Sequence, residues 1–467
     1  MPEHVHIPPP LQLPAKLNRT RLGGTVMTTL TVKLKTITPV MGGGTKTRSV
    51  DDVDIFRPPT IRGHLRFWWR AVHGHKFDGQ PRKLAAAERA LWGGMADNEQ
   101  GSRSDVEIGV TVYPRSPGED VTVAPILPRN ADSYALWPAM EISNQGLDTA
   151  PRRNPGREFS LAIRCPQARE DEVKAAVRAW IMFGGYGGRT RRGCGSLTVT
   201  GDASAWLPVT ADCTSLQLLL GNGVFCAAPI IPMSDLPLLR GAELWAGPAT
   251  ANANAAWTTA LGWLREFRQG SGSDPALHAR EPAPPTDPNR PSLSRWPEAD
   301  KMRHMYIARG YTCSHPPRHN DVPIWPRGNL GLPIVGRFQT FGRGGTPYKE
   351  PPPFMIYWFR RGEHAGSFER LASPLIVKAL PLANGQFVPM ALWFERGYPA
   401  GGEMGLYSKD RRTFVPGSLA PFDQLEAPRD TALFTILSGS PAVSGLRLRG
   451  VFFNWLGVRF GARRIAP

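Results

Sequence analysis

Alternation of apolar and polar positions predicts the first strand. In the segment TTLTVKLKTITPV the apolar side chains of Leu30, Val32 and Leu34 recur at every second position, and Ile37 is a further candidate for the same row. A period of two places successive side chains on opposite faces of a strand, so we expect this row to face the core. A glycine-rich and then proline-rich loop follows, GGGTKTRSVDDVDIFRPP.

A helical period replaces the alternation in IRGHLRFWWRAVHG. Ile61, Leu65, Trp68 and Val72 follow the i, i+4, i+7, i+11 spacing of a single buried helix face. The segment therefore predicts a helix that packs on the core through this face.

Further predicted helices and strands complete the element order of a known fold. The same two periods predict helices and strands over residues 82–93, 106–114, 157–165, 170–183 and 196–201. The resulting order of strand, helix, two strands, helix and strand is the split βαβ arrangement of the ferredoxin-like fold. We therefore predict an α+β chain whose first ferredoxin-like domain covers residues 25–212, after a flexible proline-rich N-terminal arm at residues 1–24.

A second domain is predicted over residues 213–467. Residues from about 270 to 294 are rich in Pro, Gly and Ser and predict a mobile loop. SPLIVKALPL and QFVPMALWF predict paired strands joined at Asn384-Gly385, a favoured hairpin turn. The C-terminal segment SGLRLRGVFFNWLGVRFG fits either a strand or a helix.

An excess of positive charge indicates which class of molecule the protein binds. The 467 residues include 56 Lys and Arg against 39 Asp and Glu, a net charge of +17. Such an excess favours a nucleic acid as partner, and the alternative is a basic surface without a specific ligand. Five cysteines without a CxxC pair predict a reducing compartment, and no segment approaches the roughly 20 apolar residues of a membrane span. We expect a cytoplasmic protein without a membrane partner.

Basic and aromatic residues gather on one side of the predicted helix over residues 61–74. Arg62, Arg66 and Arg70 recur about one turn apart, with Trp69 and His73 on the same side. Guanidinium groups at this spacing suit successive phosphates, and an indole ring suits a base. The alternative is a solvated basic face with a few salt bridges.

A second basic stretch, GGYGGRTRRGCG, follows the predicted helix at residues 170–183. It lacks the GxxxxGK[ST] pattern, and the negative end of the helix dipole before it would repel a phosphate. Anion binding there would depend on Arg189, Arg191, Arg192 and the loop amides. The glycines alternatively form a crossover at which two sheet elements approach closely, and the two interpretations are compatible.

Two clusters raise the question of a metal ion. Asp51, Asp52 and Asp54 follow the basic residues of GGGTKTRS and suit either a divalent ion for phosphodiester cleavage or pairing with nearby arginines. HMYIARGYTCSHPPRHN holds four residues of zinc-ligand type without the usual paired cysteines, so it fits a zinc site or a His-rich loop. These four residues are His304, Cys313, His315 and His319.

Several of these motifs together resemble a known family. RPPTIRGHLRFWWRA and GGYGGRTRRGCGSL resemble the RAMP superfamily of CRISPR proteins, and the first resembles the first RAMP subunit of type III-B (Cmr) effector complexes. RWPEADKMR, GLPIVGRF and RLASPLIVKAL resemble segments of the second RAMP domain of that subunit.

The resemblance implies two ferredoxin-like, RRM-like RAMP domains with long loop insertions in an assembly with guide CRISPR RNA, complementary target RNA and other RAMP subunits. It implies a non-catalytic cap near the guide 3′ end that needs no cofactor or metal and helps capture target RNA. The alternatives are a metal-dependent endoribonuclease that uses the three aspartates, and a cap that acts mainly through protein contacts. The candidate RNA-binding residues are Lys46, Arg48, Arg57, Arg62, Arg66, Trp69, Arg70, Arg189, Arg191, Arg192, Arg337, Arg343 and Lys378.

Overall fold

The fold is described from a computed structural model. The residues that it describes are 25–51, 53–77, 80–94, 101–128, 130–227, 236–269, 280–281, 293–341, 345, 347–360, 370–395, 402–408, 414–415 and 447–466. The predicted N-terminal arm and Arg343 lie outside these residues, as does most of the predicted loop at 270–294, of which 280–281 and 293–294 form a pair of short strands.

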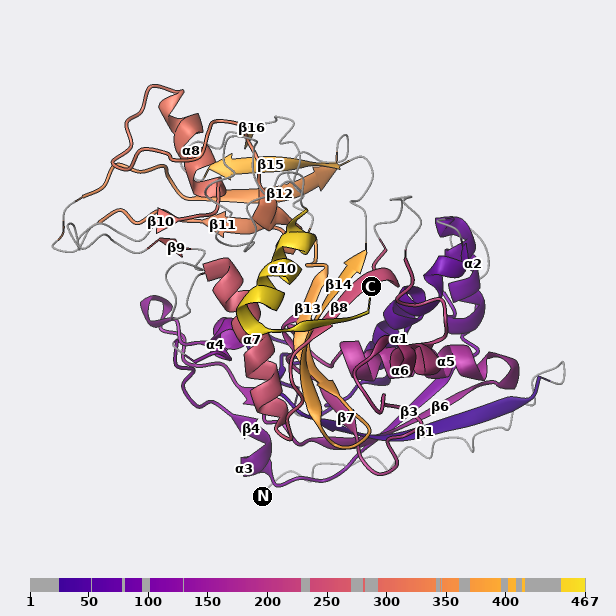
Figure 1. The fold of residues 1–467 in the computed structure, drawn as a ribbon. Coiled ribbons are helices and arrows are strands. Elements are labelled where there is room, and N and C mark those ends of the chain that lie inside the picture. The colour runs from indigo at the N-terminus through magenta and orange to yellow at the C-terminus, as the bar shows by residue number, and fades with distance from the viewer. Residues whose placement is uncertain are drawn as a thin grey trace, which may run out of the picture.

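The first half of the chain forms a four-stranded antiparallel sheet with two helices on it (Figure 1). The strands lie in the order β3-β6-β1-β7. In chain order this is strand, helix, strand, strand, helix, strand with the spatial order 2-3-1-4, which is the ferredoxin-like topology. The elements are β1 (Met27–Thr36), α1 (Pro58–His73), β3 (Glu107–Val112), β6 (Glu158–Pro166), α5 (Glu170–Phe183) and β7 (Leu197–Val199).

The predicted strand row is confirmed, with one correction. Leu30, Val32 and Leu34 are buried, but the row continues through two threonines and not through Ile37, which is only half-buried. The period of two reaches Thr36 and Thr38, and the Thr38 hydroxyl donates to the carbonyl of Gly193 at 2.6 Å. The row of buried positions thus contains polar side chains, and Thr38 ties this segment to the Gly-rich stretch.

Shorter elements surround this sheet. Helix α2 (Pro81–Trp92) was predicted, and it ends at Gly93, whose positive φ of 74° suits glycine. The others are β2 (Val40–Met41), η1 (Gly74–Phe77), α3 (Pro117–Asp120), β4 (Val121–Thr122), α4 (Ser133–Leu136), η2 (Trp137–Ala139), η3 (Ser143–Gln145), β5 (Arg152–Arg153), η4 (Gln167–Arg169), η5 (Thr190–Arg192) and α6 (Cys213–Leu220).

The second half repeats the same topology. Its sheet has the order β13-β14-β8-β17, and its elements are β8 (Leu238–Ala246), α7 (Ala253–Gln269), β13 (Leu375–Pro381), β14 (Phe387–Glu395), α10 (Leu448–Phe460) and β17 (Arg463–Ala466). The predicted hairpin between β13 and β14 is confirmed, and the C-terminal segment is a helix followed by a short strand. The domain boundary at residue 213 remains a prediction.

Long insertions extend this second unit. They carry β9 (Arg280–Glu281), β10 (Leu293–Ser294), α8 (Glu298–Ile307), η7 (Pro326–Leu330), β11 (Ile334–Gly336), β12 (Phe354–Arg360), β15 (Gly402–Ser408) and β16 (Phe414–Val415). Strands β11, β12, β15 and β16 form a separate sheet with a small core of its own. Among the described helices of the whole chain, none is long and apolar enough to cross a membrane.

The two ferredoxin-like units stack so that the second sheet is covered on both faces (Figure 1). Helix α1 contacts β8 and α5 contacts β13, while α7 packs on the opposite face. Ile376 and Leu380 of β13 join the core with α1 and α5, whereas Val377 and Ala379 join the core with α7 and α10. This double coverage explains why β13 is buried throughout and nearly continuously apolar.

Lys378 is the exception in this apolar strand, and its burial corrects the prediction that it binds RNA. The residue is fully buried, and its Nζ donates to the carbonyls of Gly184 at 2.7 Å and Ile181 at 3.2 Å. These carbonyls lie at the C-terminal end of α5, where a donor satisfies groups that the helix leaves open. Burial lowers the pKa of Lys378 to about 7.

We predict a pH-dependent stability from Lys378. Its folded-state pKa of about 7 lies below the unfolded value of about 10.4, so the unfolded chain binds more protons between these values and stability rises with pH there. The free energy of unfolding of the wild type minus that of Lys378→Met should therefore increase by roughly 2 kcal/mol from pH 7 to pH 9. Chemical denaturation at both pH values measures this difference, and a constant difference would show that Lys378 titrates alike in both states.

Candidate nucleic-acid interface

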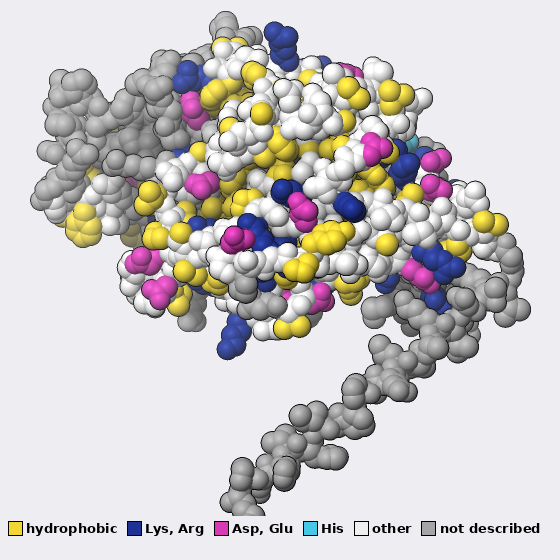
Figure 2. Space-filling view, turned by 90° about the horizontal axis from the view of Figure 1, so that it is seen from below, with side chains coloured by type: hydrophobic (Ala, Val, Ile, Leu, Met, Phe, Trp, Pro, Cys, Tyr) yellow, Lys and Arg dark blue, Asp and Glu magenta, His cyan; other side chains and the backbone are white. Residues whose placement is uncertain are grey.

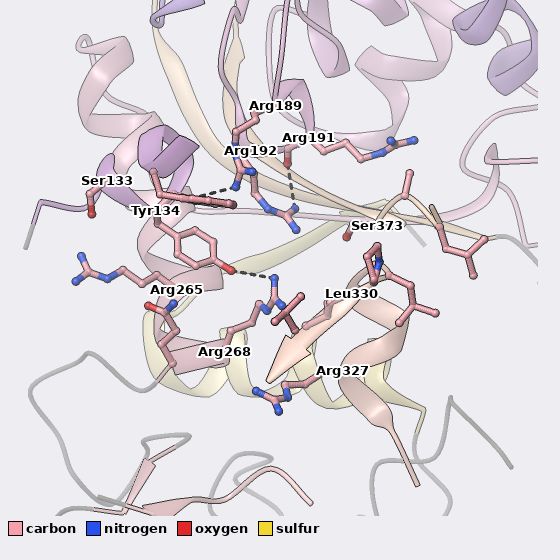
Figure 3. A pocket seen from close by; sticks show the side chains of 18 of the residues that line it. Ser133, Tyr134, Arg189, Arg191, Arg192, Arg265, Arg268, Arg327, Leu330 and Ser373 are labelled. Carbon is pink, nitrogen blue, oxygen red and sulfur yellow. Dashed lines mark hydrogen bonds between the residues drawn. The ribbon is translucent and has the colours of Figure 1, made fainter. Parts of the chain in front are cut away.

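A large cavity lies where the two ferredoxin-like units and the insertion meet. Its volume is about 780 Å³, and it is lined by the Gly-rich stretch, α4 and η2, the C-terminal end of α7, and the segment from η7 to β11 (Figure 3). Among the described residues that line it there is no Asp or Glu. Its arginines are Arg189, Arg191, Arg192, Arg265, Arg268 and Arg327. We call this cavity the arginine groove.

One of these arginines, Arg327, pairs with the buried Glu298, with Nε and Oε2 3.1 Å apart, whereas others donate to neutral oxygens. Arg268 Nη1 donates to the Tyr134 hydroxyl at 3.0 Å, and Arg192 Nη1 donates to the Leu375 carbonyl at 3.2 Å. Figure 3 shows Arg192 and Arg268 extending toward one another from the Gly-rich stretch and from α7. A neutral acceptor orients a guanidinium without cancelling its charge, so these contacts leave a positive field inside the groove.

Burial and like charges act together on the groove arginines. Burial, together with the charges of the neighbouring Arg268, Arg189 and Arg191, lowers the pKa of Arg192 to about 10. At neutral pH the side chain still carries its charge, because its pKa stays well above 7. A bound anion would relieve both the repulsion and the desolvation, so the groove is suited to a ligand with several negative charges.

Backbone contacts of the Gly-rich stretch hold this set of arginines in place. The Tyr186 amide donates to the Gly195 carbonyl at 2.9 Å, which closes the stretch into a loop. Trp257 of α7 donates to the Arg192 carbonyl at 2.7 Å. The glycines thus form the crossover foreseen as one interpretation. Arg189, Arg191 and Arg192 of the same loop line the arginine groove, and anion binding by them, the other interpretation, stays a prediction.

The basic side of α1 fits the salt-bridge alternative. Arg66 Nε and Arg70 Nη1 both donate to Glu88 Oε1 of α2, at 2.6 and 2.5 Å. Trp69 is only 1% exposed and donates to Glu172, so the prediction that it stacks on a base was wrong. Burial, followed by the charge of a nearby lysine, lowers the pKa of His73 to about 4, so this side chain is neutral and attracts no phosphate.

Arg48, which was predicted to contact RNA from the loop after β2, forms hydrogen bonds within the protein. Arg48 donates to the carbonyls of Pro138 and Met140 at 2.6 and 2.9 Å and also to that of Asp148. This side chain therefore ties the loop to the segment after η2. Lys46 is exposed and stays a candidate for RNA contact.

The aspartates of this loop organise its backbone. Asp51 Oδ1 accepts from the amides of Val53 and Asp54, both at 3.0 Å, and its other oxygen pairs with Arg57. Asp52 lies outside the described residues. Among the residues described, no group of three His, Cys, Asp or Glu is placed to hold a metal ion. The contacts of Asp51 match the arginine-pairing alternative.

The predicted His-rich loop has protein partners. His304 Nε2 lies 2.6 Å from the His319 carbonyl, and His315 Nδ1 lies 2.5 Å from Glu350 Oε1. His319 Nε2 in turn lies 2.9 Å from the Arg295 carbonyl. Because the ring nitrogens point to different partners, these contacts match the His-rich loop and not a converging zinc site.

The remaining candidates are separate from the groove. Arg62 is partly buried on α1, and Arg337 is exposed on the insertion. Figure 2 shows that Lys and Arg on the face seen from below lie at several places with Asp and Glu beside them. On that face the positive excess does not form one continuous patch, which makes the arginine groove the more specific feature.

Sequence reasoning missed part of the groove. Arg265 and Arg268 are spaced i, i+3 at the end of α7, a signal comparable to that of α1. Arg327 and Trp137 lie in short 3-10 segments, where no period marks them. Their convergence is a product of tertiary structure.

A family model and two relatives match parts of this chain. Residues 33–198 match the family model of the RAMP superfamily, which confirms the predicted resemblance over this part of the chain. From Pyrococcus furiosus, CRISPR system Cmr subunit Cmr1-1 is 28% identical over 145 residues, 31% of this chain and 40% of the relative. Cmr1-2 of the same organism is 25% identical over 178 residues, 36% of this chain and 92% of the relative. The match to Cmr1-1 thus spans about two fifths of that protein.

A solved structure also resembles the chain. The crystal structure of apo Cmr1 from Pyrococcus furiosus has a TM-score of 0.47 and 14% identity, and the alignment covers 94% of this chain and 99% of that one.

We predict that closure of the Gly-rich loop requires glycine at position 195. A Cβ there would collide with the carbonyl oxygen of Tyr186, and φ is +64°. Gly201 is a matched control, because its φ of +88° is equally unfavourable for alanine but nothing lies within 4 Å of the added Cβ. Gly201→Ala should cost about 1 kcal/mol of unfolding free energy and Gly195→Ala at least twice as much. Equal losses in chemical denaturation would contradict the close contact.

Proposed function

We propose that this chain is a non-catalytic RNA-binding subunit of a type III-B CRISPR RNA-guided effector complex in the cytoplasm. The observation that carries the proposal is the arginine groove, which gathers six arginines and no described acidic lining residue at the junction of both units and the insertion. A net charge of +17 is consistent with a polyanionic partner.

The chemistry of the groove favours phosphates. Guanidinium groups bind phosphate oxygens through paired hydrogen bonds, and they hold their charge at neutral pH. The arginines reach the groove from the Gly-rich stretch, from α7 and from η7, so a bound chain would contact several phosphates at once. Contacts to phosphates carry no sequence information, so base pairing with the guide would supply sequence choice.

The relatives support the proposed assembly. Their names describe Cmr subunits of a CRISPR system. Independently, residues 33–198 of this chain match the RAMP superfamily model. We therefore propose guide CRISPR RNA, complementary target RNA and other RAMP subunits as partners. We place the chain at the end of the complex near the guide 3′ end, where it would help to capture target RNA for antiviral defence.

The non-catalytic role is part of the proposal. A metal-dependent endoribonuclease would need carboxylates open to a divalent ion. Asp51 instead accepts two backbone amides and pairs with Arg57, so its oxygens support the loop. Of the described aspartates in this cluster only Asp54 is exposed, and a single carboxylate holds a divalent ion weakly, so the binding role is the better supported of the two.

The test removes two groove charges and compares them with two charges elsewhere. Arg265→Gln with Arg268→Gln should weaken binding of single-stranded RNA roughly 10-fold. The slope of log affinity against log salt concentration should also become shallower, by an amount that corresponds to about one to two phosphate contacts. Fluorescence anisotropy at several salt concentrations measures both quantities.

The matched control is Arg103→Gln with Arg164→Gln. These arginines are 65% and 51% exposed and both pair with Glu107, outside the groove. The control removes the same net charge and should change affinity and salt dependence much less. Equal effects of the two double variants, with equal melting temperatures, would show that net charge and not the groove determines binding.

A further inference from the structure

One aromatic side chain at the arginine groove is exposed and does not pack in the core. Trp137, the first residue of η2, lines the groove and is 59% exposed. The Arg189 guanidinium lies over its ring, 5.4 Å from the centroid. A single exposed aromatic side chain is common on protein surfaces, but this one lies at a groove lined by arginines. An arginine on one face of the ring leaves the other face available for stacking.

The segment that carries Trp137 is anchored before any ligand binds. Arg48 donates to the carbonyls of the next residue, Pro138, and of Met140 at 2.6 and 2.9 Å. Tyr134, one turn earlier, accepts from Arg268 through its hydroxyl. The indole therefore lies on a fixed support, and stacking on it requires little ordering of the chain.

The wall contributed by the insertion is mostly apolar, apart from Arg327, which pairs with Glu298. Leu332, Pro333 and Val335 line it, and Val335 is 64% exposed. The groove thus combines a cationic wall, an apolar wall and an exposed indole. Phosphates suit the first, and the flat faces of bases suit the other two.

This combination distinguishes single strands from duplexes. In a duplex the bases are paired and stacked, so its outer surface offers mainly phosphates and sugars to a side chain. A single strand exposes base faces together with its phosphates. An apolar wall would contribute nothing to a duplex, whereas it would cover unpaired bases.

We infer that the arginine groove binds an unpaired RNA segment, with one base stacked on the open face of Trp137 and the adjacent phosphates on the arginines. The inference rests on the proposed function and extends it by naming the form of RNA and the residue that contacts a base. Trp137 takes the role that sequence reasoning gave to Trp69.

The experiment separates base contacts from phosphate contacts. Fluorescence anisotropy would compare the full-length wild type, Trp137→Ala and Trp137→Phe on three labelled probes: a single-stranded RNA of about ten nucleotides, the same strand with abasic sites, and a duplex of equal length. Phe341→Ala is the control, since Phe341 is an aromatic residue 60% exposed on the insertion that does not line the groove.

We expect Trp137→Ala to weaken binding of the base-bearing single strand roughly 10-fold and to leave the abasic strand and the duplex within about 2-fold of the wild type. Trp137→Phe should retain most of the affinity because it keeps a flat ring, and Phe341→Ala should match the wild type.

Other outcomes overturn the inference in distinguishable ways. An equal loss on the abasic strand would show that Trp137 supports the fold or the phosphate contacts. Unchanged RNA binding with impaired assembly into a complex with other subunits would assign Trp137 to a protein contact. Failure of the wild type to bind any of the probes would overturn the proposed function itself.

Discussion

The packing of the second sheet against the end of α5 is the constraint on which the rest of the structure depends. Lys378 of β13 donates to the Gly184 carbonyl at the end of that helix, and Arg192 just beyond it donates to the Leu375 carbonyl of the same strand. Trp257 adds a third contact from α7. Because these contacts run in both directions between the two units, the Gly-rich loop has one position relative to both sheets.

The arginine groove follows from this position. A loop on a single ferredoxin-like unit would present its arginines to open solvent, where hydrated and flexible side chains bind phosphate weakly. Here the same loop lies against α7 and faces the insertion, so Arg189 and Arg268 enter one partly desolvated space. The glycines allow close backbone contact, and the groove is a consequence of that contact.

The sequence predicted the fold better than the site, for a physical reason. The periods that define strands and helices are local, so β1, α1, α5 and the β13–β14 hairpin were all foreseen. A period identifies only one buried face, however, and α1 contacts both β3 and β8. Trp69 is buried beyond the predicted face because it donates to Glu172 of α5 and packs against Phe77. Lys378 is a single polar residue in a strand covered on both sides. Arg265 and Arg268 join the loop arginines only through tertiary packing.

Arginines elsewhere in the chain pair with carboxylates, and this sets Arg192 and Arg268 of the groove apart from them. Arg66 and Arg70, about one third exposed, share the carboxylate of Glu88, so this fold does place acids beside adjacent arginines. In the groove, Arg192 and Arg268 instead donate to a carbonyl and a hydroxyl, although burial and mutual repulsion lower the pKa of Arg192. A carboxylate there would stabilise the isolated chain but would compete with an external anion. Among the groove arginines Arg327 does pair with a carboxylate, that of Glu298. The neutral partners of Arg192 and Arg268 keep these two side chains oriented and charged, an arrangement that suits a phosphate.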